Sequence, residues 1–178
     1  MLKYRVVIRG IAPLLFNRFP DEDNPEGKSR QKTAHSTRDE QVEKSLYRDE
    51  KGKVYQPAEH IIGAMIKAAS AFKLEGKKTY RDVVSAGVFI EPMKIVHVKQ
   101  KYITDWRSVV IKATRGRVMR GRARMDTWEL KFDLICIDDR MDDNALKEII
   151  KYAGGYIGVG DYRPRYGRFE VLSLEKVK

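Results

Sequence analysis

The order in which hydrophobic periodicity changes along the chain restricts its fold more than any other feature. Apolar and polar side chains alternate over residues 2–9, as in a half-buried strand. Over residues 55–73 the apolar residues instead recur at every third or fourth position, which predicts an amphipathic helix with Pro57 in its first turn. The chain therefore starts with a strand followed by a helix.

Both periods then return further along the chain. Residues 86–98 are predicted to be extended, with Pro92 marking an edge or a break, and residues 128–137 alternate cleanly. A second helix is predicted over residues 138–155, where aspartates at its start cap free amides, and a last strand over residues 167–177.

The predicted order is β-α-β-β-α-β, which is the ferredoxin-like (RRM-like) arrangement of an α+β fold. Two long insertions interrupt this core, at residues 17–53 and 99–127. A chain of 178 residues is long enough for one full core, so we expect a single domain over residues 1–178.

The first insertion, residues 17–53, is too polar to bury a core of its own. It contains nine basic and nine acidic side chains among Pro, Gly, Ser and Asn, and we expect it to order poorly by itself. Asp21, Glu22 and Asp23 can orient a metal or a ribose hydroxyl, although the same residues are typical of a polar loop.

Charge and cysteine content indicate partner and compartment. The net charge of +11 makes an acidic polymer the first partner to consider. Cys136 is the only cysteine, which excludes an internal disulfide and favours a reducing cytosol. No apolar run approaches the roughly 20 residues that span a bilayer, and the charged, alternating N-terminus is unlike a signal peptide. We expect a soluble cytoplasmic protein that does not enter membranes.

The strongest charge signal is the segment "RSVVIKATRGRVMRGRAR", residues 107–124, called the basic ribbon below. It has seven basic residues and no acidic one. Its basic residues are Arg107, Lys112, Arg115, Arg117, Arg120, Arg122 and Arg124. In an extended chain several of them share a face, and Gly116 and Gly121 let the backbone approach a ligand. The ribbon can lie along a phosphate backbone; the alternative is a solvated basic loop.

Residues 152–171 hold five of the thirteen glycines. Gly154 is expected to stop the second helix, and residues 158–168 are called the glycine loop below. So many glycines indicate that something approaches the backbone closely, and three arginines indicate that it is anionic. We predict that Gly158 and Gly160 offer amides to phosphate oxygens. The arginines are Arg163, Arg165 and Arg168.

Aromatic residues flank both basic segments. Trp106, Trp128, Tyr162 and Tyr166 are candidate platforms on which bases stack, although Trp128 and one of the tyrosines can instead belong to the core.

Catalysis has less support in the sequence. His35, His60 and His97 are scattered and form no metal-ligand spacing with the single cysteine, so we predict no metal and no cofactor. His60, beside Tyr55 or Lys67, can act as a general base in metal-independent RNA cleavage. The stretch "GYIGVG" follows a helix and precedes a strand, which is the reverse of the order in dinucleotide sites.

Two stretches, "QPAEHIIGAMIKA" and "YAGGYIGVGDYRPRYGRFEV", resemble the RAMP superfamily, the ferredoxin-fold RNA-binding proteins of CRISPR systems. The first matches a family pattern through Pro57, Ile61 and Gly63. The second matches through Gly158, Val159, Gly160, Gly167, Arg168 and Phe169. The resemblance covers roughly residues 2–16, 54–98 and 128–174.

Within this family the chain is most similar to single-domain backbone subunits that polymerise along a guide RNA. Those proteins carry a long loop after the first strand and a thumb between the second and third strands, where the two insertions fall. The resemblance implies that Glu59, His60, the glycine loop and the basic ribbon line one RNA track. The chain departs from the pattern because Arg163–Arg165 makes the loop unusually cationic and stiff.

The leading hypothesis is a non-catalytic, sequence-independent binder of single-stranded nucleic acid, RNA in preference to DNA. It would act as a repeated subunit beside copies of itself and other complex subunits. Three alternatives remain: a guide-RNA-processing endoribonuclease that uses His60, a viral or mobile-element protein that coats or anneals single-stranded DNA, and a basic scaffold with an acidic protein partner. The leading hypothesis requires the ribbon and the glycine loop to converge in space.

Overall fold

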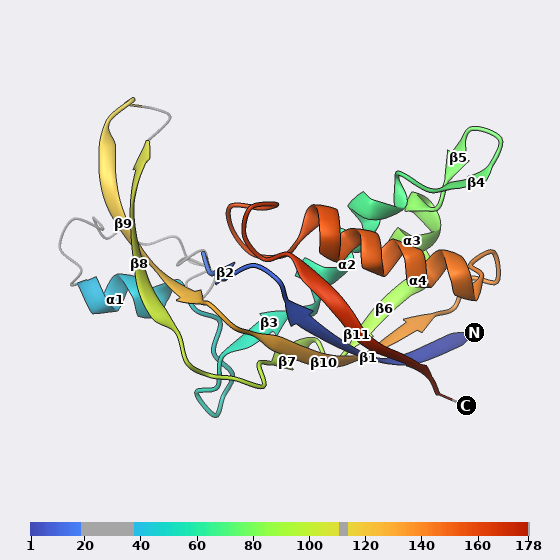
Figure 1. The fold of residues 1–178 in the computed structure, drawn as a ribbon, viewed down its shortest axis with the longest axis horizontal. Coiled ribbons are helices and arrows are strands. Elements are labelled where there is room, and N and C mark those ends of the chain that lie inside the picture. The colour runs from blue at the N-terminus through green and yellow to red at the C-terminus, as the bar shows by residue number, and fades with distance from the viewer. Residues whose placement is uncertain (19–37, 111–113, 178) are drawn as a thin grey trace, which may run out of the picture.

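A four-stranded antiparallel sheet forms the centre of the fold in the computed structural model, which describes residues 1–18, 38–110 and 114–177. Its strand order is β11-β1-β10-β6 (Figure 1). The strands are β1 (Leu2–Gly10), β6 (Val88–Glu91), β10 (Glu129–Cys136) and β11 (Phe169–Lys176). The strands predicted over residues 2–9, 128–137 and 167–177 are all present.

Alternation places one side of each strand in the core. Tyr4, Val6 and Ile8 of β1 are buried, and Val6 pairs with the buried Phe132 of β10. Trp128, just before β10, is 1% exposed and donates its indole N–H to the Ala12 carbonyl at 2.9 Å. Trp128 is therefore a core residue and not a stacking platform.

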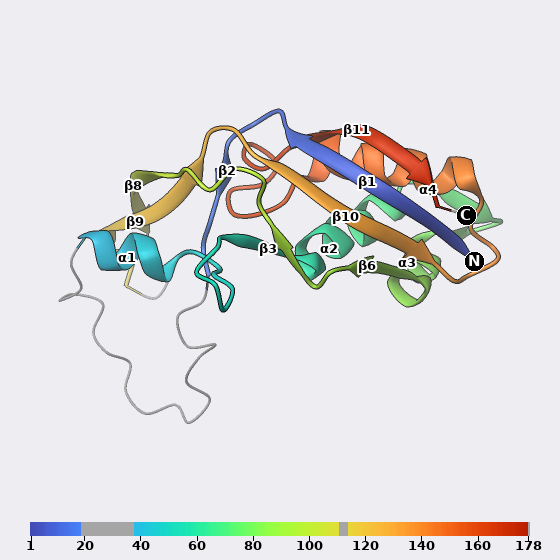
Figure 2. The same ribbon diagram turned by 90° about the horizontal axis from the view of Figure 1, so that it is seen from below.

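Helices α2 (Ala58–Ala69) and α4 (Asp143–Tyr152) lie on one face of the sheet, behind the strands in Figure 2. A shorter helix, α3 (Arg81–Gly87), packs against α2 and β6. Asp142 caps α4 by accepting a hydrogen bond from the Ala145 amide at 2.8 Å, as predicted for this acidic start.

The second helix does not stop at Gly154, which corrects the prediction. Its chain continues as a π-helical turn, η3 (Ala153–Ile157), and the left-handed Gly158 follows that turn. Gly154 is buried inside it, where a Cβ would lie 2.3 Å from the Phe169 carbonyl oxygen. The glycine is needed for close packing of η3 against β11.

Pro92 breaks the segment predicted as one strand over residues 86–98. Its first residues end α3, and the rest divides into β6 and β7 (Lys94–Val96). Strand β7 pairs with β3 (Tyr55–Pro57) in a separate two-stranded sheet, so the break at Pro92 is confirmed. A small hairpin, β4 (Lys73–Glu75) with β5 (Lys78–Thr79), lies between α2 and α3 in the chain.

The second insertion forms a long antiparallel hairpin that projects from one end of the molecule (Figure 1). Its strands are β8 (Ile103–Val110) and β9 (Arg117–Met125), and β2 (Leu14–Leu15) joins β9 as the third strand of this sheet.

Part of the first insertion is packed against another element of the protein. Helix α1 (Arg38–Lys44) lies against β9, and Val42 and Leu46 are buried. Residues 19–37 lie outside the described residues, and with them Asp21, Glu22, Asp23 and His35.

Antiparallel sheets with separate helices confirm the α+β class. Within the described ranges, no helix has the length and apolar character needed to cross a bilayer.

Candidate nucleic-acid interface

The β8–β9 hairpin has two chemically different faces. Arg107 pairs with Arg120, and Asp105 pairs with Arg122, so these side chains share one face with Arg124. On the other face, α1 covers β9, where the Gly121 amide donates to Gln41 and the Ala123 amide donates to the Ser45 hydroxyl at 2.9 Å. The fold thus presents an arginine face, which consists of Arg107, Arg120, Arg122 and Arg124.

The arginine face lies against the glycine loop. The Arg107 guanidinium donates to the Tyr166 hydroxyl and lies 4.7 Å from the Tyr166 ring centroid and 5.5 Å from that of Tyr162. Arg122 forms an ion pair with Asp161 at 2.9 Å and lies 5.3 Å from the Tyr162 centroid. The ribbon and the glycine loop therefore converge, as the leading hypothesis requires.

Asp105 is the buried acid of this arrangement, with 6% of its surface exposed. Its carboxylate accepts hydrogen bonds from Arg107 and, at 2.8 Å, from Arg124. The hydrogen bond from Arg107 is the largest effect that lowers the pKa of Asp105, and the bond from Arg124 adds to it. Arg124 also pairs with Asp126 at 2.8 Å.

Three of the ribbon's seven basic residues are therefore already paired with carboxylates. Arg107, Arg122 and Arg124 fasten the hairpin to itself and to the glycine loop, so their charge is partly offset. The prediction that all basic residues of the ribbon neutralise phosphates is therefore restricted to those without a carboxylate partner. Asp105 and Asp161 were missed by the sequence analysis. Asp105 lies two residues before the ribbon, and Asp161 lies in the glycine loop with its arginines.

The remaining arginines of both segments are available to a ligand. Within the described part of the chain, six of them form no ion pair, and all are exposed except the half-buried Arg120. They are Arg115, Arg117, Arg120, Arg163, Arg165 and Arg168. Lys112 lies outside the described residues.

Backbone amides of the glycine loop are directed into the protein itself. The Gly158 amide donates to the Ala153 carbonyl at 2.8 Å, and the Asp161 amide donates to the Leu15 carbonyl at 2.9 Å. The Gly167 amide likewise donates within the chain, to Pro13 at 2.8 Å. The amide of Gly158 is thus already bonded, which corrects the prediction that it serves a phosphate.

Close approach to these glycines is made by the protein's own chain. Gly160 has φ +77°, and a Cβ there would lie 2.6 Å from Leu14 Cδ1 and 2.7 Å from the Leu15 carbonyl oxygen. Gly121 similarly accommodates the ring of Trp106, whose nearest atom lies 3.0 Å from the position of a Cβ. The glycine loop and β2 are therefore packed backbone to backbone.

Exposed aromatic surface at this site comes mainly from Tyr162, which is 42% exposed. Its ring meets Tyr166 edge-on with centroids 6.4 Å apart. Tyr166 and Trp106 are half-buried. Of the four predicted platforms, Tyr162 is the one most open to a base.

His60 lies in a cleft beside the glycine loop, in the first turn of α2. The cleft is lined by Leu15, Phe16, Asn17, Tyr47, Gln56, His60, Gly160 and Asp161. The imidazole Nδ1 is hydrogen-bonded to the Gln56 amide nitrogen, and its ring meets Tyr47 edge-on at 5.5 Å. Tyr47 thus takes the place expected for Tyr55, and Lys67 lies in the last turn of the helix.

His97 is a core residue with 2% exposure, packed edge-on against Phe16 and Trp128. Desolvation lowers its pKa to about 4. Across the described ranges, no group of three or more His, Cys, Asp or Glu is arranged to hold a metal ion.

Comparisons with known proteins find similarity in structure and not in sequence. No protein-family model matches the chain, and no curated protein does. A chain in the cryo-EM structure of the Type III-B Cmr-beta bound to cognate target RNA superposes with a TM-score of 0.64 at 12% identity, over 99% of this chain and 61% of that one. The protein thus spans about three fifths of that chain's length.

A CRISPR protein from Archaeoglobus fulgidus, known from a crystal structure, gives a TM-score of 0.42 at 13% identity, over 100% of this chain and 65% of that one. The resemblance to CRISPR proteins is confirmed at the level of the fold by the Cmr-beta chain.

Proposed function

We propose that the protein binds single-stranded nucleic acid, RNA in preference to DNA, as a non-catalytic and repeated subunit of a CRISPR-type ribonucleoprotein. The observation that carries this proposal is the contact between the arginine face and the glycine loop, through Arg107 with Tyr166 and Arg122 with Asp161. The two segments that meet there also carry six arginines without carboxylate partners among the described residues.

We further propose that the core is a ferredoxin-like domain. The strand order β11-β1-β10-β6 supports it, since these are the fourth, first, third and second strands of the predicted β-α-β-β-α-β series. Helix α2 connects the first of these strands to the second, and α4 connects the third to the fourth.

Binding would rest on phosphate neutralisation by arginine side chains. Arg163, Arg165 and Arg168 extend from the glycine loop, and Arg117 and Arg120 extend from β9. Guanidinium groups bind phosphate oxygens in a bidentate manner without reading bases, so this contact is independent of sequence. Tyr162 offers an aromatic face to one base.

The comparison supports RNA as the ligand in one respect. The Cmr-beta complex, which contains a chain with this fold, is bound to target RNA. We carry that ligand over to this protein because its fold is similar and because its hairpin and glycine loop carry arginines without carboxylate partners among the described residues.

The salt dependence of binding tests the proposal. If four or five phosphates are engaged, the logarithm of the affinity for an RNA homopolymer should fall with the logarithm of salt concentration with a slope of about −3. Fluorescence anisotropy with labelled oligonucleotides measures this slope. A flat slope, or no binding at moderate salt, would contradict the proposal and favour an acidic protein partner.

Competition between RNA and DNA oligomers of one sequence tests the preference for RNA. Only a site that contacts the 2′-hydroxyl gains from RNA. Equal competition would favour the single-stranded DNA alternative.

Metal-independent RNA cleavage by His60 is a second candidate, favoured by the position of His60 in a cleft beside the glycine loop. Wild-type protein would then cleave a hairpin RNA in the presence of a chelator, and His60→Ala would bind that RNA without cleaving it. Intact RNA after incubation with the wild type would exclude this candidate.

A further inference from the structure

The cleft beside His60 contains a buried polar group with an unmet hydrogen-bonding requirement. Gln56 is 1% exposed, and its amide nitrogen is bonded to His60. Its amide oxygen has no hydrogen-bond partner. A buried acceptor without a donor costs about 1–3 kcal/mol, so such a group usually receives a donor from a ligand or an ordered water.

The walls of the cleft combine flat and polar surfaces. The rings of Tyr47 and His60 form one part of the lining, and the Asn17 amide and the Asp161 carboxylate form another. The space within this half-open cleft is about 140 Å³, equivalent to roughly five molecules of liquid water. Such a space fits a small planar heterocycle and is too polar to remain dry.

The cleft also lies next to the proposed phosphate contacts. Gly160 and Asp161 line it, and Arg163 follows them two residues later on the exposed side of the glycine loop. A nucleotide whose phosphate contacts the glycine loop therefore has its base within reach of the cleft.

We propose that this cleft binds one unstacked nucleobase of the bound strand, with the amide of Gln56 accepting a hydrogen bond from a base N–H. The inference rests on the proposed function and adds a base subsite to it. Unstacked bases in single strands are commonly held by aromatic rings and polar side chains in this way. All four RNA bases carry N–H donors, so the subsite is compatible with binding that does not depend on sequence.

Small ligands test the subsite apart from strand binding. Uridine and cytidine 5′-monophosphates are titrated into isotope-labelled protein and compared with ribose 5-phosphate, which has the same sugar and phosphate but no base. The side-chain amide signals of Gln56 and the ring signals of His60 should shift in a saturable manner at millimolar nucleotide, and should not shift with ribose 5-phosphate.

The variant Gln56→Leu removes the amide and keeps a side chain of similar size. It should lose the nucleotide-induced shifts of His60 and bind RNA about tenfold more weakly, while its salt slope stays unchanged. Ser85→Ala, an exposed change in α3 outside the lining of the cleft, is the control and should behave like the wild type. If Gln56→Leu fails to fold, Tyr47→Leu tests the aromatic wall with the same readouts.

Two results would overturn the inference. Equal signal shifts with ribose 5-phosphate would show that the cleft binds a sugar or a phosphate and not a base. No signal shift at the solubility limit of the nucleotides would show that the cleft holds only water. A protein that binds RNA with a steep salt slope in either case retains the proposed function without a base subsite. If nucleotides shift the amide signals of Gln56 but the protein binds no RNA strand, the proposed function is refuted and the base-binding cleft is supported.

Discussion

Asp105 forms ion pairs with two arginines of the hairpin and so offsets part of their charge. It is buried between Arg107 and Arg124, whereas Asp126, the other carboxylate bonded to Arg124, has a side chain that is 52% exposed. A buried carboxylate that joins two guanidinium groups has a larger structural effect than an exposed one, because removing it leaves two partly buried cations facing each other.

We expect Asp105→Asn to lower the free energy of unfolding by about 2 kcal/mol, since both arginines are partly solvated and the full cost of a buried pair is reduced. Urea unfolding measures the change. Asp126→Asn is the control and should cost less than about 0.5 kcal/mol. Equal losses in the two variants would contradict the structural role of Asp105.

His97 makes stability depend on pH. Its pKa in the folded state is about 4, below the ordinary value of 6.5, because burial disfavours the charged ring. The unfolded chain therefore takes up the proton first as pH falls. The stability that a neutral His97 contributes to the folded state is fully present above about pH 6.5 and is lost progressively as the pH falls toward 4.

The free energy of unfolding should fall by about 3 kcal/mol over this range on account of His97. His97→Leu should flatten the pH profile between pH 7 and pH 4, as measured by urea unfolding at several pH values. If the pH profile of the variant runs parallel to that of the wild type, other groups cause the pH dependence of stability.

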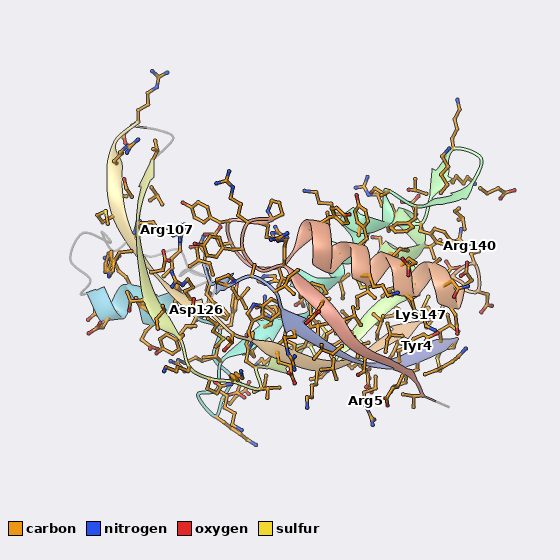
Figure 3. All side chains as sticks on the ribbon, in the orientation of Figure 1. Tyr4, Arg5, Arg107, Asp126, Arg140 and Lys147 are labelled. Atoms are coloured by element: carbon orange, nitrogen blue, oxygen red, sulfur yellow. The ribbon has the colours of Figure 1, made fainter. Side chains whose placement is uncertain are left out.

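At the scale of elements, the glycine loop combines a rigid backbone with exposed cations. Replacing Arg163, Arg165 and Arg168 together by alanine should weaken binding to every RNA sequence alike and reduce the salt slope by about 2. Arg5→Ala is the control, because Arg5 is exposed on β1 at a distance from Arg107 (Figure 3). Selective loss for one sequence would indicate that these arginines read bases.

Two glycines at different positions should respond to alanine with opposite signs. Gly160→Ala places a Cβ against Leu14 and Leu15 in a left-handed conformation, so we expect a loss of about 2 kcal/mol or more. Gly63 is exposed within α2 with no atom near a new Cβ, and Gly63→Ala should stabilise the protein by about 0.5–1 kcal/mol. Thermal unfolding compares both variants, and destabilisation by Gly63→Ala would contradict the account of α2.

At the scale of the whole molecule, the hairpin extends away from the sheet (Figure 1). Two apolar side chains near its end are exposed. Val110 is 55% exposed and Met119 is 57% exposed. Exposed apolar residues on a projecting element are suited to contact a neighbouring protein chain. The proposed repeated subunit supplies such a neighbour.

We therefore expect the number of protein copies per RNA to rise in steps as the strand is lengthened. Light scattering of complexes with RNAs of increasing length measures this number, and Met119→Lys should reduce assembly while a single copy still binds a short strand. One copy per strand at every length would contradict the repeated subunit.

Local pattern was sufficient to predict much of the fold. The strands β1, β10 and β11 and the helices α2 and α4 follow from alternation and helical periodicity, because burying one side of a strand or helix fixes which positions are apolar. The sharing of one face by Arg120, Arg122 and Arg124 also follows, because this segment is extended. The pairing of β8 with β9 in a hairpin was not predicted. Helix α1 was missed, since its short apolar pattern depends on β9 for burial.

The candidate site was predictable in composition and not in its pairings. The ribbon and the glycine loop were identified by charge and glycine content, which are properties of the sequence. Which arginines pair with Asp105 and Asp161, and which part of the chain approaches Gly160, depends on contacts between residues that lie far apart in the sequence.

The sequence by itself determined the order of the strands and helices of the core, the basic character and the positions of the two cationic segments, because these depend on neighbours a few residues apart. Only the tertiary structure decided that Arg107, Arg122 and Arg124 brace the hairpin while Arg163 and Arg165 remain exposed. The reason is electrostatic and geometric: a cation is offset by whichever carboxylate the fold brings within a few ångströms, and separation along the chain does not specify that distance.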